Sequence, residues 1–215
     1  MIDEAMRRVW RAAAASLAVV VGGCASVMTE EECAVADWGA LGEIDGANGE
    51  IAERFDERAS RCREFGFGVD ADSYFAGRTA GLETYCLPET GFAEALDGRA
   101  YQGVCPPEAE PAFLEEYALG EELRIRQLAY DEAVADYERA LEELRDNRYE
   151  LRRARSRYEE NVLSDEERAE LRDNIRLYRR EIERLEDDLP LLEVDIERAS
   201  RLLDDYRGFL ARIRG

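Results

Sequence analysis

The chain of 215 residues contains no histidine and no lysine. Without lysine it cannot form a P-loop lysine contact or a Schiff base, and without histidine it cannot form a Ser-His-Asp or Cys-His pair. Histidine-ligated metal sites are excluded for the same reason. Much of hydrolase and transferase chemistry is therefore closed to this chain, and we expect a protein that is not an enzyme and requires no cofactor.

Basic residues are also few in relation to acidic ones. The chain has 29 basic residues, all arginine, against 50 aspartates and glutamates, for a net charge of −21. A chain this acidic is repelled by nucleic acid and by anionic lipid head groups. We therefore expect no nucleic-acid partner.

A long apolar run is missing as well, because the uncharged stretch at residues 12–23 is shorter than the ~20 residues of a membrane-spanning helix. Three arginines, Arg7, Arg8 and Arg11, precede this stretch, and small residues end it. This order is typical of a secretory signal peptide, which we place at residues 1–23. The alternatives are a signal peptide followed by a chance cysteine and a buried core helix. The pattern leaves open whether translation starts at Met1 or Met6.

The segment Val21-Gly22-Gly23-Cys24 resembles the bacterial lipobox. This resemblance implies cleavage before Cys24 and acylation of that cysteine with palmitate-like chains, which together give a stable membrane anchor. Ala25 follows the cysteine, where an aspartate would imply retention at the inner membrane. We therefore expect Cys24 to be the lipidation site and the protein to be held in the outer membrane, facing the periplasm.

Four further cysteines follow, and an even number in an exported chain indicates two disulfides with three possible connectivities. We favour pairing Cys33 with Cys62 and Cys86 with Cys105, because each bond then closes a local loop inside one similar-looking unit. A zinc site is the alternative, but the spacing contains no C-x-x-C and the expected compartment is oxidising. The cysteines are thus predicted to be structural.

The proline-rich segment at residues 106–111 divides the chain into a module at residues 24–110 and a second one at residues 111–215. Glycines four apart lie on one helix face, where another backbone can approach closely. The first module is therefore predicted to be a compact bundle of short helices with glycines as packing notches. The alternative is a ligand pocket lined by Trp38, Tyr74 and Tyr101. The spaced aromatic and glycine residues are Trp38, Gly42, Gly46 and Gly49, then Tyr74, Gly77 and Gly81, with an echo in Tyr117 and Gly120.

Two acidic clusters in the first module are candidate sites. Residues 45–50 contain calcium-like ligands, but they lack the spacing and the distal glutamate of an EF-hand. Asp70 and Asp72 could form a pair of carboxylates for glycoside chemistry, which requires a defined separation across a cleft. In so acidic a chain, helix capping or solvent exposure is the better interpretation, and we assign no catalytic or metal-binding residue.

Many spaced cysteine, glycine, aspartate and aromatic positions of the first module together form a recognisable pattern. They are Cys33, Asp37-Trp38, Gly42, Asp45-Gly46, Gly49, Cys62, Gly68-Val69-Asp70, Tyr74, Gly77-Arg78, Gly81-Leu82, Tyr85-Cys86, Tyr101, Gly103-Val104-Cys105-Pro106 and Phe113. Over roughly residues 33–123, this pattern resembles a family of proteobacterial lipoproteins, domain of unknown function family 2799. The resemblance implies an envelope lipoprotein and supplies no activity.

Heptad periodicity dominates the second module. From Leu171 to Leu210, twelve apolar positions follow one another in alternating steps of four and three, and residues 123–162 keep the same steps with polar residues at Gln127, Arg148 and Arg155. Between these arms, Ser164-Asp165-Glu166-Glu167 forms a capping box that starts a new helix. We predict an antiparallel coiled-coil hairpin over residues 111–215, with its turn near residues 161–165 and Leu144 paired with Leu185. Pro190 is expected to kink the second arm.

The expected fold is all-α: a small disulfide-bonded helical module followed by a long antiparallel coiled-coil hairpin. The expected function is that of an outer-membrane-anchored periplasmic lipoprotein, a non-enzymatic structural or protein-docking element with an envelope protein partner. An envelope enzyme or small-ligand binder, with its site in the disulfide module, is the alternative. Adaptors of efflux or secretion assemblies also use coiled hairpins, but they place β-rich domains on both sides of them.

Overall fold

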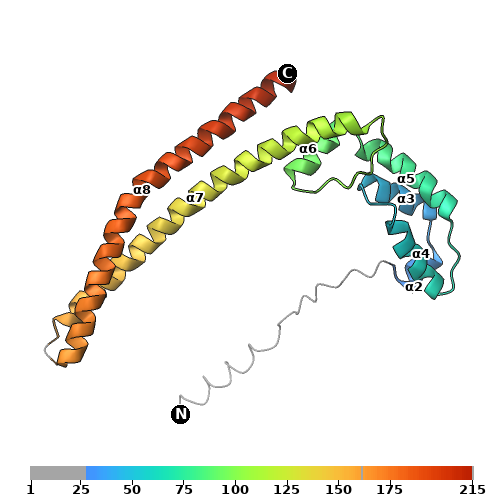
Figure 1. Ribbon diagram of the computed structural model, residues 1–215. Helices are drawn as coiled ribbons and strands as arrows, with labels where there is room; N and C mark the ends of the chain where they lie inside the picture. Colours follow the sequence, from blue (N-terminus) through green and yellow to red (C-terminus); the bar gives the residue numbers. More distant parts are fainter. Residues whose placement is uncertain (1–27, 161, 215) are drawn as a thin grey trace, which may run out of the picture. The chain divides into compact units, whose positions relative to one another are not determined.

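The computed structural model describes residues 28–160 and 162–214, which form helices and no strand (Figure 1). The predicted all-α fold is confirmed. The expected signal peptide and Cys24 lie outside the described residues. The helices are α2 (Glu30–Ala34), α3 (Trp38–Ala47), α4 (Arg54–Glu64), α5 (Ala71–Tyr85), α6 (Pro88–Leu96), α7 (Glu110–Tyr158) and α8 (Asp165–Arg214).

The chain divides into two compact units, one ending at Thr84 and the other beginning at Tyr85. This division differs from the one that the proline-rich segment suggested near residue 110. The reason is that α7 starts at Glu110 and packs its first turns against α6, so the second disulfide and the hairpin belong to the same unit.

The first unit is built around three aromatic side chains. Trp38, Phe55 and Tyr74 are buried, and their ring centroids lie 5.0–6.4 Å apart, mostly in tilted or edge-on arrangements that aromatic pairs prefer. Local signals set the helix starts: Thr29 and Glu32 form a reciprocal capping box on α2, and the Asp37 side chain caps α3.

Glycines let α3 and α5 meet backbone to backbone. A Cβ atom added to Gly42 would lie 1.9 Å from the carbonyl oxygen of Tyr74, and one added to Gly77 would lie 2.0 Å from that of Gly39. Neither distance is tolerable for real atoms, so a larger residue at either position would force the helices apart. The prediction that these glycines are packing notches is confirmed.

The α3–α5 arrangement occurs a second time, in α6 and α7. A Cβ atom on Gly42 would strike the carbonyl oxygen of Tyr74, and one on Gly91 would lie 2.4 Å from that of Phe113. The second helix of each pair also contributes a glycine: Gly81 of α5 faces the Glu43 carbonyl of α3, and Gly120 of α7 faces the Phe92 carbonyl of α6.

Hydrogen bonds at the ends of the two short helices repeat as well. The Glu50 amide donates to the Asp45 carbonyl, as the Arg99 amide does to the Glu94 carbonyl, both at 2.9 Å. In the first pair, the side chain of Arg78 donates to the Glu50 carbonyl at 2.7 Å. At the equivalent position of the second pair, the Tyr117 hydroxyl donates to the Arg99 carbonyl at 2.9 Å. Each unit therefore contains one copy of the same glycine-packed helix pair with one disulfide.

The hairpin is formed by α7 and α8, of 49 and 50 residues, which pack against each other (Figure 1). Helices of this length extend about 75 Å at 1.5 Å per residue. Ser164 and Glu167 form the predicted capping box, with the Ser164 amide donating to Glu167 at 2.8 Å and the Glu167 amide to Ser164 at 3.3 Å. Leu144 packs with Leu185, as the predicted register requires, and α8 continues through Pro190.

The seam of α7 differs from the predicted one in part. All twelve predicted positions of α8 are buried or half-buried, but Arg148 and Arg155 of α7 are exposed. Ala154 is buried in place of Arg155, and Asn147 is half-buried in place of Arg148. At these positions the contact face lies one residue toward the N-terminus, whereas Leu144 and Leu151 are buried as predicted. The two arginines remain outside the buried contact with α8. Arg148 instead forms an ion pair with Glu186 of α8 at 2.5 Å.

Candidate functional site

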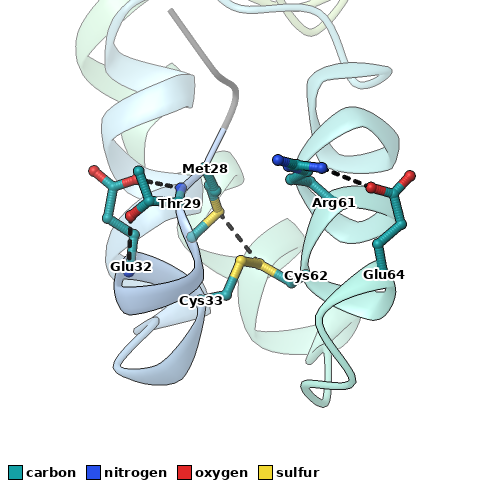
Figure 2. The surroundings of a disulfide bond; sticks show 7 residues. All are labelled: Met28, Thr29, Glu32, Cys33, Arg61, Cys62 and Glu64. Carbon is teal, nitrogen blue, oxygen red and sulfur yellow. Dashed lines mark hydrogen bonds and ion pairs between the residues drawn. A yellow bond between two sulfur atoms is a disulfide. The ribbon is translucent and has the colours of Figure 1, made fainter.

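The first disulfide joins α2 to α4 in the core of the first unit. Cys33 and Cys62 are buried, with Cα atoms 5.3 Å apart, and the Met28 sulfur lies 3.7 Å from the Cys62 sulfur (Figure 2). Figure 2 also shows that the nearby polar pairs, Thr29 with Glu32 and Arg61 with Glu64, bond within their own helical turns. Burial keeps the sulfur atoms away from external thiols, so this bond is structural.

The second disulfide joins Cys86, which lies between α5 and α6, to Cys105 in the loop between α6 and α7, with a Cα–Cα distance of 5.6 Å. Tyr101 secures this loop, since its hydroxyl accepts from the Cys105 amide and donates to Glu110, both at 2.9 Å. Both predicted disulfide pairs are confirmed.

A buried ion pair links α3, α4 and α5. Asp45 is only 2% exposed, and Arg58 approaches its two carboxylate oxygens in a bidentate contact at 2.7 and 2.8 Å. Tyr74 donates its hydroxyl hydrogen to the same carboxylate at 2.6 Å. Asp45 is the most completely buried charged residue in the described part of the chain. Its position on α3 lets it contact both α4 and α5.

The environment of Asp45 balances its charge. The hydrogen bond to Asp45 raises the pKa of Arg58, and burial together with the same carboxylate raises the pKa of Tyr74 well above its usual range. Both groups therefore keep the protons with which they bind Asp45. Since Arg58 and Tyr74 already occupy both carboxylate oxygens, Asp45 is placed as a structural anchor and not as a calcium ligand.

The other two candidate carboxylates lie at the start of α5. Asp70 accepts from the Ser73 amide at 3.0 Å and from the Ser73 hydroxyl at 2.7 Å, and these bonds lower its pKa. Asp72, in the first turn of α5, is exposed. Asp70 therefore caps the helix and Asp72 faces solvent, the two interpretations that the sequence favoured for these carboxylates.

The three aromatic residues considered for a ligand pocket do not share one core. Trp38 and Tyr74 pack in the first unit, whereas Tyr101 packs in a tilted arrangement against Phe113 in the second, with ring centroids 4.8 Å apart. A different hollow of about 300 Å³ lies on the first unit, lined by Met28, Glu32, Val35, Ala36, Asp37, Ala40, Leu41, Ile44 and Arg58.

Arg58 was not singled out from the sequence, although a signal for it exists. It lies four residues before Cys62 and three after Phe55, so it shares the buried face of α4 with them. An arginine on a buried face needs an anionic partner, which Asp45 provides.

Within residues 28–160 and 162–214 there is no cluster of three potential metal ligands among histidine, cysteine, aspartate and glutamate. In the same described part of the chain, no helix has the length and apolar character needed to cross a bilayer.

These features define a disulfide-bonded, all-helical domain that contains two glycine-packed helix pairs. Residues 37–122 match the family described as protein of unknown function, DUF2799. The match begins at the cap of α3 and ends in α7 just after Gly120, so it spans both helix pairs and omits most of the hairpin. No curated protein and no solved structure matches the chain.

Proposed function

We propose that the protein is a lipoprotein anchored in the outer membrane, which presents a helical hairpin in the periplasm as a non-enzymatic docking element. The observation that carries this proposal is the pair of buried disulfides, because such bonds form and persist in oxidising compartments outside the cytosol. The lipobox-like segment ending at Cys24 supports the anchor, and the first described helix begins only six residues later, at Glu30.

The surroundings of the candidate acids support a role without catalysis. Asp45 is neutralised by Arg58, Asp70 caps α5, and Asp72 faces solvent. A general acid or base needs a free proton-transfer partner and a positioned substrate. Asp45 and Asp70 serve structural purposes instead, and Asp72 remains in solvent.

The hairpin supports a docking role. Large apolar side chains remain exposed on it, including Ile125, Leu128, Leu191 and Leu202. Helices that pack against each other and still expose further apolar residues provide surface for an additional helix.

The anchor is tested by replacing Cys24 with alanine and following incorporation of labelled palmitate in cells. We expect loss of label and an uncleaved or soluble protein. Ala25→Asp provides the matched control, since it should keep the label but move the protein to the inner membrane. Normal labelling of Cys24→Ala would refute the anchor assignment.

A further inference from the structure

Charges of opposite sign are separated along one face of the hairpin. Asp131, Glu138, Arg145 and Arg152 follow one another at intervals of seven residues on α7. Residues seven apart share one side of a helix in a coiled coil, and Glu138, Arg145 and Arg152 indeed line one groove of about 750 Å³. The two acids lie away from the turn and the two arginines lie toward it.

Helix α8 carries the same order on the same face. Arg172, Arg179, Glu186 and Glu193 also follow at intervals of seven, again with the arginines toward the turn. The faces of the two helices are joined at two points. Arg148, in the α7 groove, donates to Glu186, and the two arginines of α8 share a second groove with Arg155.

Several other arginines of the hairpin have acidic partners within their own helix. Arg139, Arg153, Arg176 and Arg198, for example, each pair with an acid three residues away. By contrast, within the described residues Glu138, Arg145 and Arg152 form no ion pair. The face therefore presents unneutralised charges of both signs in a fixed order.

When two copies of this series run in opposite directions, each charge faces a charge of opposite sign. If a second α7 lies antiparallel to the first, Asp131 meets Arg152 and Glu138 meets Arg145. Both pairs are centred on the same point, between Leu141 and Glu142. One heptad further out, Arg124 and Glu159 are again opposite in charge and centred there. A parallel second copy would instead place like charges together.

We propose that this face binds a second copy of the chain in antiparallel orientation, about a two-fold axis near Leu141. In such an isologous contact each residue meets its counterpart in both directions. An unrelated acidic segment would satisfy the arginines but leave Asp131 and Glu138 without cations, whereas a second copy satisfies both halves. Leu141, which is 39% exposed, gives the contact an apolar centre.

This inference rests on the docking role proposed for the hairpin, and it is independent of the lipid anchor. It is tested in the full chain with Cys24→Ser, in which the other four cysteines are paired, so that an introduced cysteine is the single free thiol. Leu141→Cys places this thiol next to the axis, and a short bismaleimide should link two copies. Glu143→Cys is the control, because two residues turn a helix by about 200° and place the thiol on the other side of α7.

Charge-reversal variants made in the Leu141→Cys chain test whether the opposite charges pair between two copies. Arg145→Glu with Arg152→Glu makes the series entirely acidic, and Asp131→Arg with Glu138→Arg makes it entirely basic. Each variant alone should lose the crosslinked dimer down to the level of Glu143→Cys, while a mixture of the two should recover it. Circular dichroism melting checks that all variants remain folded.

The proposal is overturned if Leu141→Cys crosslinks no better than Glu143→Cys. It is equally overturned if the charge variants crosslink as well as the parent, or if mixing them restores nothing. Because this chain carries no lipid, none of these results bears on the anchor, which the palmitate experiment tests separately.

Discussion

Replacement of Asp45 by asparagine removes the charge that compensates Arg58 while keeping the side-chain size. The side chains of Arg58 and Asp45 are 14% and 3% exposed, so the arginine would lose its partner in a largely dry environment. Removal of one member of a buried ion pair costs about 3–5 kcal/mol. Because Arg58 keeps some contact with water, we expect about 3 kcal/mol for Asp45→Asn.

Urea unfolding followed by tryptophan fluorescence measures this effect in the first unit. Trp38 packs on Phe55 and Tyr74, and the other tryptophan, Trp10, lies in the expected signal peptide. With a urea dependence of about 2 kcal/mol per molar, the midpoint should fall by about 1.5 M. The same replacement at exposed Asp72 should leave the midpoint in place.

A double-mutant cycle with Tyr74→Phe then examines the hydrogen bond. The phenol donates to a charged acceptor at 2.6 Å, and such bonds contribute about 1.5–3 kcal/mol. Since Asp45 is shared, the two changes should not be additive. If Asp45→Asn shifts the midpoint no more than Asp72→Asn does, or if the two effects simply add, the buried network does not hold these helices together.

Two further changes concern the helix pairs. Burial raises the pKa of Tyr85 from 10 to about 12, so the contribution of its neutral form is complete below pH 10 and is lost as pH rises to 12. We expect a loss on the order of 3 kcal/mol over this range, measured by urea unfolding of the second unit, and a much smaller loss in Tyr85→Phe. Gly42→Ala should destabilise the first unit by about 1–3 kcal/mol through overpacking. Gly68→Ala, whose Cβ would meet nothing within 4 Å, should change stability little. Equal effects of the two substitutions would contradict the close contact between α3 and α5.

How far the sequence predicts the hairpin depends on which arm is considered. In α8 apolar residues recur at twelve successive positions without a polar interruption, so periodicity determines the contact face. In α7 two adjacent faces compete: Leu141 lies beside Ala140, and Arg155 beside Ala154. The pattern favoured the face containing Leu141, but packing against α8 buries the alanines. Small residues give weak periodic signals, and their burial becomes evident only with the partner helix in place.

The sequence indicated the repeated helix pair only weakly, through a spaced tyrosine and glycine that recur once. The sequence suggested only that Tyr117 and Gly120 echo the series Tyr74, Gly77 and Gly81, and the structure makes Tyr117 the counterpart of Arg78 and Gly120 that of Gly81. Arginine and tyrosine share no side-chain chemistry beyond a hydrogen-bond donor at the end of a long side chain. The equivalence therefore rests on where each donor reaches, which a comparison of residue types does not detect.

The second copy of this helix pair also explains why no boundary falls at the proline-rich segment. Phe113 and Gly120 belong to α7, yet they contact Gly91 and Phe92 of α6, so the pair requires the first turns of the long helix. Prolines at residues 106, 107 and 111 end the preceding loop and start α7, and Pro111 fits the first turn of a helix without disrupting it. The hairpin is thus a continuation of the helix that packs against α6 and completes the second helix pair.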